Sequence, residues 1–229
     1  DMVLRDYQKT GYKWLRILDR YKFGGILADD MGLGKTLQVI ALFQTQEKEN
    51  TSIVICPSSL TLNWRNEINR FAKGIKTCVI RGTASERKEL IKDVQKYDVI
   101  ITSYDLLKRD IEQYEELNYN FRYIIADEAQ YIKNSNTQNS KALKSLRGTT
   151  RFALTGTPIE NSLAELWSIF DYIMPGYLFG YTKFKKLFET EIVKNNEQNK
   201  LQKLRTMIEP FILRRTKRQV LTELPDKTI

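Results

Sequence analysis

The sequence contains no histidine and only two cysteines in 229 residues. The lack of histidine excludes every mechanism that depends on an imidazole base. Cys56 and Cys78 are too few thiolates to form a structural zinc site, so we expect no zinc. They also form no disulfide framework, which favours a reducing compartment, and no targeting signal is visible. We therefore expect an intracellular protein of the cytoplasm and nucleoid, or of a nucleus.

Long apolar runs are also missing. The longest, such as residues 53–56 and 123–126, have the length of a strand, whereas a membrane-spanning helix needs about 20 apolar residues. We expect no membrane partner. The chain has 37 Lys+Arg against 28 Asp+Glu, a formal net charge of +9, which favours an anionic partner such as nucleic acid. Its 41% hydrophobic residues suffice for the core of one large domain, or of one domain with an appendage.

Helical patterns alternate with short β-branched runs over about the first 160 residues, which predicts an α/β fold with a parallel sheet. The expected strands are residues 26–28, 53–56, 77–80, 99–101, 123–126 and 152–154. The expected helices are residues 4–18, 35–47, 60–72, 83–96, 137–146 and a helix from Ser162 that Pro175-Gly176 ends. Capping boxes are expected at Thr83/Glu86 and Ser162/Glu165. Periodicity assigns Trp14, Trp64 and Trp167 to the core.

Beyond Gly176 the β-runs stop, and residues 182–191 and 197–207 have helical patterns that predict an appendage. The basic cluster at residues 214–218 is the one local concentration of charge. A new strand is expected to start within residues 224–229.

The segment after the first strand reads Asp-Asp-Met-Gly-Leu-Gly-Lys-Thr and leads into a helix, the context of a phosphate-binding loop. Lys35 in the first helical turn opposes the helix dipole unless an anion compensates it. We expect Lys35 to hold the β/γ-phosphates of ATP and Thr36 to ligate Mg²⁺. The residues expected to bind nucleotide here are Asp29, Gly32, Leu33, Gly34, Lys35 and Thr36. The strict pattern requires glycine at Asp29, so an ordinary turn with a solvated lysine is the alternative.

Asp127 and Glu128 follow the apolar run 123–126. Ligands gather at the carboxyl ends of parallel strands, so Asp127 is a candidate Mg²⁺ ligand. Glu128 is then the candidate to orient and deprotonate the attacking water. The alternative is a helix cap or solvated surface.

Thr155, Gly156 and Thr157 end another apolar strand, and their hydroxyls could sense the γ-phosphate or link it to another site. The alternative is a capped turn held by Pro158.

The whole chain resembles the first motor lobe of helicase superfamily two, specifically the Swi/Snf-type double-stranded DNA translocases. The segments that carry the resemblance are residues 4–8, 29–36, 56–60 with Asn63-Trp64, 101–105, 127–130 with Lys133-Asn134, 154–161 and 211–217. Asp30 looks like a shortened form of the family's usual glutamate in the loop. Gln130 replaces the family's common histidine, so its contact with Thr155 would be a neutral amide hydrogen bond.

The resemblance implies a RecA-like sheet flanked by helices, with Gln8 recognising adenine and Gln130 coupling the Thr155–Thr157 motif to the nucleotide site. The residues that it places on the DNA backbone are Pro57, Ser58, Ser59, Thr102, Ser103, Tyr104, Lys133 and Asn134. Such contacts position a protein without reading base sequence. Ser58-Ser59 are alternatively, or also, a helix cap before Leu60. For Arg214-Arg215, DNA contact and organisation of the link to a second lobe remain equal alternatives.

The resemblance divides the chain into a RecA-like ATP-binding lobe at 1–175, a helical protrusion at 176–212 and a connecting segment at 213–229 toward a second RecA-like lobe. It predicts the motor lobe of a DNA-dependent ATPase and translocase that uses Mg²⁺-ATP and duplex DNA, with hydrolysis requiring the second lobe. A strand-separating or RNA helicase is one alternative. A non-catalytic nucleic-acid-binding module is the other.

Overall fold

The computed structural model describes residues 4–45, 50–157 and 162–223. A seven-stranded sheet in the order β3-β4-β2-β5-β6-β1-β7 forms its centre, and every strand pair is parallel. The strands are β1 Gly25–Leu27, β2 Ser52–Cys56, β3 Thr77–Val79, β4 Val99–Ser103, β5 Asn120–Ala126, β6 Arg147–Leu154 and β7 Ile212–Leu213. The predicted parallel α/β sheet is confirmed.

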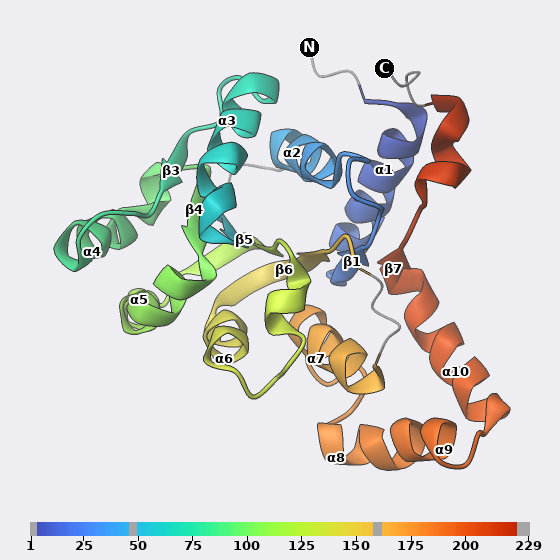
Figure 1. The fold of residues 1–229 in the computed structure, drawn as a ribbon. Coiled ribbons are helices and arrows are strands. Elements are labelled where there is room, and N and C mark those ends of the chain that lie inside the picture. The colour runs from blue at the N-terminus through green and yellow to red at the C-terminus, as the bar shows by residue number, and fades with distance from the viewer. Residues whose placement is uncertain (1–3, 46–49, 158–161, 224–229) are drawn as a thin grey trace.

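Helices cover both faces of the sheet, with α1, α2 and α3 on one face and α5, α6 and α7 on the other (Figure 1). The α-helices as far as Ile173 are α1 Asp6–Arg20, α2 Lys35–Thr45, α3 Thr61–Phe71, α4 Ala84–Lys92, α5 Tyr104–Leu117, α6 Gln138–Ser145 and α7 Leu163–Ile173. Short 3₁₀ segments are η1 Ser58–Leu60, η2 Val94–Lys96 and η3 Ala129–Ile132. The central strands β2 and β4 are buried along their whole length, because a parallel sheet covered on both faces needs continuous apolar runs.

The expected capping box at Thr83 is present: its hydroxyl accepts from the backbone N–H of Glu86, and the Glu86 carboxylate accepts from the Thr83 N–H. The prediction of a capping box at Ser162 is wrong. Ser162 is the N-cap of α7 but makes no side-chain cap bond, and Glu165 pairs instead with Lys133. Trp64 and Trp167 are buried as predicted, and Trp14 is half-buried.

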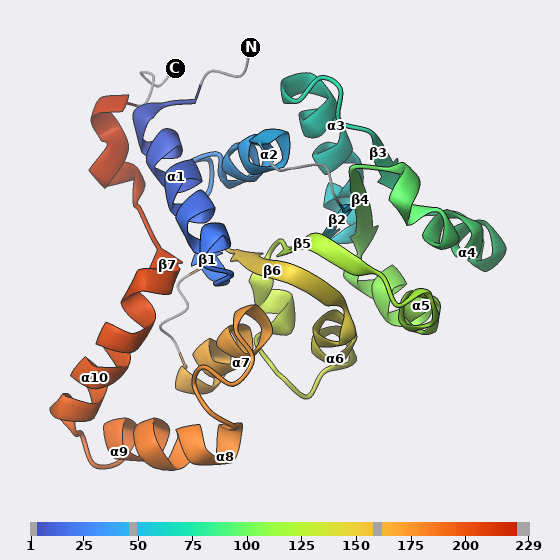
Figure 2. The same cartoon turned by 180° about the vertical axis from the view of Figure 1, so that it is seen from behind.

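The chain after residue 176 is helical, as expected, but it also returns to the sheet. α8 Tyr181–Phe184, a π-helical stretch Lys185–Glu189 and α9 Thr190–Val193 follow one another without a break. α10 Gln198–Ile208 and η6 Glu209–Phe211 lead to β7, and η7 Lys217–Glu223 follows beside α1 (Figure 2). β7 pairs with β1, so the expectation that the β-runs stop beyond Gly176 and resume only at residues 224–229 is wrong.

The proposed boundaries at residues 175 and 212 stay predictions. The strand expected at 224–229 lies outside the described residues. Along the described ranges, no helix combines the length and apolarity needed to cross a membrane.

Candidate nucleotide-binding site

The three candidate motifs follow three neighbouring strands, β5, β6 and β1. Their register aligns Ala126 with Ala153, and Leu27 with Leu154. The Thr155 N–H donates to the Leu27 carbonyl at 3.1 Å, which continues the ladder past the end of β6. The phosphate loop, the Asp127 pair and the Thr155 motif therefore meet at one edge of the sheet.

The phosphate loop, residues 29–36, turns through two glycines in the left-handed region, with φ of 85° at Gly32 and 77° at Gly34. A side chain at Gly34 is disfavoured by φ, and a Cβ there would lie 2.4 Å from Nε2 of Gln8, whose side chain would have to move. Leu33 points inward and is buried with Tyr7 and Val220. Leu33 therefore does not occupy the N-terminus of α2, where phosphate binding requires free backbone N–H groups.

Lys35 is the first residue of α2, and its Nζ donates to the carbonyl of Asp29 at 2.7 Å and to that of Asp30 at 3.4 Å. Burial lowers the pKa of Lys35, and the carboxylates of Asp29, Glu128, Asp127 and Asp30 partly oppose that shift. A half-buried ammonium at a helix N-terminus is unfavourable without anions. The surrounding carboxylates supply the negative charge here, the two carbonyls accept hydrogen bonds, and a phosphate group would fit the same requirement.

Asp127 is held through both oxygens. Its Oδ2 accepts from Nε1 of Trp64 at 2.8 Å, and its Oδ1 accepts from the backbone N–H of Glu128 at 2.9 Å. Burial raises the pKa of Asp127, and the Trp64 hydrogen bond opposes this by stabilising the carboxylate. The hydroxyl of Tyr104 donates to the Asp127 carbonyl at 2.7 Å. Glu128 has φ of 52°, a left-handed backbone that is uncommon for a non-glycine residue and turns the chain sharply after Asp127.

Gln130 links Glu128 to the Thr155 motif. Its Nε2 donates to the Glu128 carboxylate at 2.8 Å, and its Oε1 accepts from the Thr155 hydroxyl at 3.4 Å. The amide contact expected from the sequence is therefore present, while its coupling role stays a prediction. A Cβ on Gly156 would lie 2.9 Å from Met31 and 3.7 Å from Nζ of Lys35, so this motif lies directly against the phosphate loop.

Asp29 does not face the loop interior. Its side chain is fully buried and pairs with Arg215, whose Nη2 lies 2.5 Å from Oδ2. Gln38 on α2 donates to the same oxygen at 3.3 Å. The departure from the strict phosphate-loop pattern thus has a structural explanation: the residue that replaces glycine anchors the loop to the C-terminal part of the chain.

Gln8 is buried on α1, and its amide Nε2 donates to the Leu33 carbonyl at 3.2 Å while its Oε1 accepts from the Arg5 N–H at 3.0 Å. This places the side chain at the phosphate loop, next to Gly34. Recognition of adenine by Gln8 stays a prediction.

The candidate DNA-facing residues fall into two groups. Ser58 and Ser59 are exposed in η1 after the half-buried Pro57. Neither serine is the N-cap of α3, which is Leu60, so the alternative that they cap this helix is wrong. Lys133 and Asn134 are exposed after η3, and Nζ of Lys133 lies 3.1 Å from Oε1 of Glu165.

Thr102, Ser103 and Tyr104 differ from that group because their side chains are buried. Ser103 is the N-cap of α5, and its hydroxyl accepts from the Leu106 N–H. The strand expected at 99–101 continues to Ser103, and α5, a helix outside the predicted set, begins at once. DNA contact by these residues stays a prediction. Contact through their side chains would require these buried groups to become exposed.

Oxygen donors suited to Mg²⁺ are present, since Thr36 follows Lys35 after β1, and Asp127 follows β5, which β6 separates from β1 in the sheet. Among the described residues no group of three or more metal-ligating side chains is placed to hold a metal ion. Mg²⁺ commonly binds through one or two protein oxygens together with substrate phosphates, and this donor set fits that mode.

Fold and site together define a nucleotide-binding α/β domain of the RecA-like type. The chain belongs to the family of SNF2-related domains, whose sequence model matches residues 7–229. It is similar to a solved structure, the Sulfolobus solfataricus SWI2/SNF2 ATPase core in complex with double-stranded DNA, with a TM-score of 0.89 and 43% identity over 98% of this chain and 47% of that one.

Two curated relatives illustrate the range of the family. The chain is 45% identical to the ATP-dependent helicase MG018 of Mycoplasma genitalium, over 99% of this chain and 22% of that protein. It is 38% identical to the TATA-binding protein-associated factor MOT1 of Saccharomyces cerevisiae, over 99% of this chain and 13% of that protein. The chain therefore spans about a fifth or less of these relatives, and about half of the solved SWI2/SNF2 core.

Proposed function

We propose that this chain is the first motor lobe of an ATP-dependent double-stranded DNA translocase. The observation that carries the proposal is the convergence of Lys35, Asp127-Glu128 and Thr155 at the ends of three adjacent strands. ATP would bind with its β- and γ-phosphates on the loop amides and Lys35. In a family of SNF2-related domains, such a site is the expected place of ATP use.

Each carboxylate has a distinct role in the proposal. Asp127, whose orientation is fixed by Trp64, would hold Mg²⁺ together with Thr36. The bound ion supplies charge compensation for the phosphates. Glu128 accepts from Gln130 and is the residue to orient and deprotonate the attacking water. Gln130 would report the state of that carboxylate to Thr155.

Duplex DNA is the proposed nucleic-acid partner. The net charge of +9 favours a polyanion, and exposed Ser58, Ser59, Lys133 and Asn134 provide hydroxyl, ammonium and amide donors for phosphate oxygens. The DNA in the similar SWI2/SNF2 core supports the choice of duplex over single strands. Free Cys56 and Cys78 agree with an intracellular location, which we infer from the composition.

The decisive test compares Mg²⁺-ATP binding by the chain and by Lys35→Ala in calorimetric titrations. We expect the variant to bind much more weakly while unfolding at a similar temperature, because Lys35 is the cation that the loop places at its helix N-terminus. Unchanged affinity would remove the phosphate-loop assignment.

The second test separates the alternatives. ATP hydrolysis by a longer chain that includes a second lobe is measured with duplex DNA, single strands and RNA. Stimulation by duplex supports the translocase, and stimulation by single strands or RNA supports a helicase. Absence of turnover with intact nucleotide binding supports a non-catalytic module.

A further inference from the structure

The side chain of Arg215 fills a buried junction beside the phosphate loop. Its Nε donates to Oδ1 of Asp29 at 2.9 Å and its Nη2 to Oδ2 at 2.5 Å, a bidentate pair. Nη2 also donates to Oε1 of Gln38 at 2.8 Å, and Nη1 donates to the Tyr7 carbonyl. The Arg215 side chain is 12% exposed and that of Asp29 is 0% exposed. A bidentate arginine fixes the orientation of its carboxylate as well as attracting it.

The backbone around Arg215 is bonded to the same loop. We name residues 212–217 the strap. It begins with β7, passes the end of β1 and lies alongside the start of the phosphate loop. Its carbonyls accept from the loop side: Ala28 N–H donates to the Leu213 carbonyl at 2.7 Å, and Asp30 N–H donates to that of Arg215 at 3.0 Å. In return the Lys217 N–H donates to Oδ2 of Asp30 at 3.0 Å. The strap and the start of the loop are therefore joined residue by residue.

Asp29 connects this junction to Lys35. Its carboxylate is held by Arg215, while its carbonyl accepts from Nζ of Lys35 at 2.7 Å. Gly11 on α1 leaves the space for the junction, because a Cβ there would lie 1.8 Å from Oε1 of Gln38 and 2.8 Å from Nη2 of Arg215. A displacement of the Asp29 carboxylate would therefore move the carbonyl that sets the position of the Lys35 ammonium.

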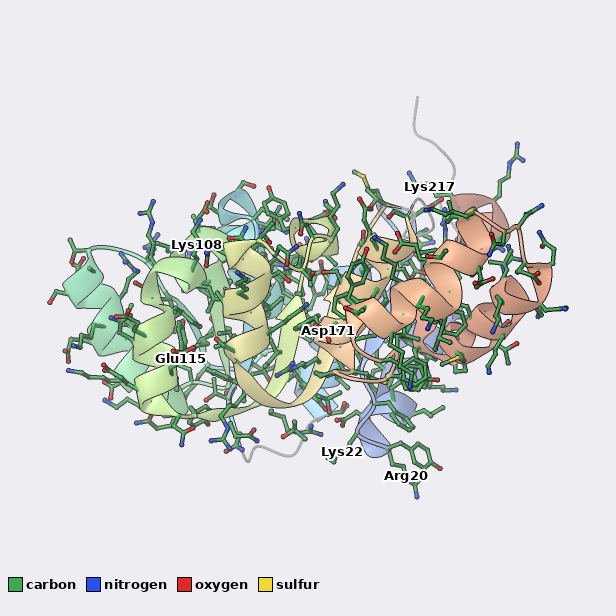
Figure 3. All side chains as sticks on the ribbon, turned by 90° about the horizontal axis from the view of Figure 1, so that it is seen from below. Arg20, Lys22, Lys108, Glu115, Asp171 and Lys217 are labelled. Atoms are coloured by element: carbon green, nitrogen blue, oxygen red, sulfur yellow. The ribbon has the colours of Figure 1, made fainter. Side chains whose placement is uncertain are left out.

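We propose that Arg215 is a positioning residue of the nucleotide site, which acts through Asp29 to hold the loop and Lys35 in the geometry that binds the ATP phosphates. The inference rests on the proposed nucleotide binding. It adds to that site Arg215, which follows β7 and is 186 positions from Asp29 in the sequence. The strap continues into η7 Lys217–Glu223, so a movement of this segment would be transmitted through Arg215 to the loop. Figure 3 shows Lys217 on the upper side of the view and Arg20 at its lower edge.

The test uses Arg215→Gln, which keeps an amide donor but loses the bidentate pair. Partners that orient metal ligands are typically worth about 10–100-fold in metal affinity; by analogy, we expect Mg²⁺-ATP affinity to fall by about 10-fold when Arg215 no longer orients Asp29. Amides of residues 30–36 should exchange hydrogen faster in the absence of nucleotide. The measurements are calorimetric titration and hydrogen exchange at a temperature where both proteins are folded.

Arg87→Gln is the matched control. Arg87 forms an equally buried bidentate pair with Asp110, at 2.6 Å and 2.7 Å, between α4 and α5. Both variants should unfold more easily, but Arg87→Gln should keep nucleotide affinity and loop exchange. If Arg215 acts through Asp29, the double variant Asp29→Asn/Arg215→Gln should bind no more weakly than Arg215→Gln.

Two outcomes would overturn the proposal: nucleotide affinity of Arg215→Gln within twofold of the original chain with unchanged loop exchange, or an equal loss of affinity in Arg87→Gln. The exchange measurement uses no nucleotide. It therefore decides whether Arg215 holds the loop even if the original chain does not bind ATP. Failure of the original chain to bind ATP would count against the proposed function and not against the role of Arg215 in holding the loop.

Discussion

Nε1 of Trp64 on α3 donates a hydrogen bond of 2.8 Å to Oδ2 of Asp127 at the end of β5. Both side chains are buried, with Trp64 1% exposed and Asp127 8% exposed. α3 follows directly on the exposed serines of η1. The helix that leads away from a candidate DNA-facing turn thus carries the residue that orients a candidate Mg²⁺ ligand, a short physical connection between the two sites.

Trp64→Phe tests this connection. The phenyl ring preserves most of the packing but leaves Oδ2 of Asp127 without its donor. Leaving a buried acceptor unpaired costs about 1–3 kcal/mol, so the free energy of unfolding should fall by that amount. We also expect weaker Mg²⁺-ATP binding, with more Mg²⁺ needed for half-saturation. Urea unfolding and titrations at several Mg²⁺ concentrations measure both effects.

Trp167→Phe is the control for that variant, since Nε1 of Trp167 donates to the Phe179 carbonyl at 3.0 Å and the side chain is 8% exposed. It should lose stability but keep the original nucleotide affinity and Mg²⁺ requirement. Equal effects of the two variants on binding would show that Trp64 matters only for packing.

The hydrogen bonds of Asp19 make the stability of the fold depend on pH in the acid range. It lies on α1 and accepts from Arg122, from Tyr123 at 2.8 Å and from Thr150 at 2.8 Å. Burial raises its pKa, but the hydrogen bonds from Arg122, Thr150 and Tyr123 outweigh burial and bring the pKa below its ordinary value of 3.8. A lowered folded pKa means that the stabilisation is present above 3.8 and is lost as pH falls through the folded value.

Asp19→Asn should therefore flatten the loss of stability on acidification below about pH 4, because the group that takes up a proton on unfolding is gone. At neutral pH the variant should be less stable than the original chain, since Arg122 loses its charged partner. Urea unfolding at a series of pH values measures both. Asp105→Asn, at an exposed ion pair with Lys108, is the control and should reproduce the original acid profile. An equally steep profile for Asp19→Asn would contradict the assignment.

The sequence allowed the main parts of the nucleotide site to be predicted because each motif directly follows an apolar run. Lys35, Asp127 and Thr155 needed only one inference, that their strands are parallel and end at one edge, and the sheet confirms it. No sequence pattern, however, gives the order of the strands. The adjacency of β5, β6 and β1, which brings the motifs into contact, was visible only in the structure.

The interactions that hold these residues could not be predicted. Arg215 and Asp29 are 186 positions apart, and β7 has two residues, too few to show a strand period. Periodicity correctly placed Trp64 in the core but contains no information on which acceptor its indole finds. The departure at Asp29 was the one available signal, because a carboxylate in place of a loop glycine needs a partner.

Binding to duplex DNA should depend steeply on salt and little on base sequence. Each neutralised phosphate contributes about −0.9 to the slope of log affinity against log salt. Lys133→Ala should make that slope shallower by about 0.9, because Lys133 is exposed on the connection after η3. Fluorescence anisotropy at several salt concentrations measures the slopes.

Arg20→Ala is the control for DNA binding, since Arg20 ends α1 just before the start of β1, whereas the candidate site lies where the strands end; Figure 3 shows Arg20 at the lower edge of the view and Lys217 on its upper side. It should leave the slope unchanged. A flat salt response of the original chain, or a strong preference for one base sequence, would contradict backbone binding. The buried Thr102 offers a further comparison: Thr102→Val should leave affinity unchanged if the side chain stays buried with DNA bound.

Hydrolysis of ATP depends on arginines near the reacting phosphate. Arginines that contact the transferring phosphoryl group are worth about 10³–10⁵ in turnover in phosphoryl-transfer enzymes. Arg215, which lies beside the loop, is held by Asp29, Gln38 and Tyr7 and so is not placed to serve as such an arginine. The 229-residue chain should therefore bind ATP but hydrolyse it barely above background, with or without DNA.

A longer protein that continues past Ile229 into a second RecA-like lobe should hydrolyse ATP in response to duplex DNA, because DNA lying across both lobes favours the closed arrangement. Glu128→Gln in that protein should abolish turnover and retain nucleotide binding, since the amide cannot take a proton from water. DNA-stimulated hydrolysis by the 229-residue chain at a comparable rate would mean that its own arginines complete the site, or that two copies do so together. A dilution series distinguishes these, because the specific activity of a dimer falls with concentration whereas that of a self-sufficient monomer does not.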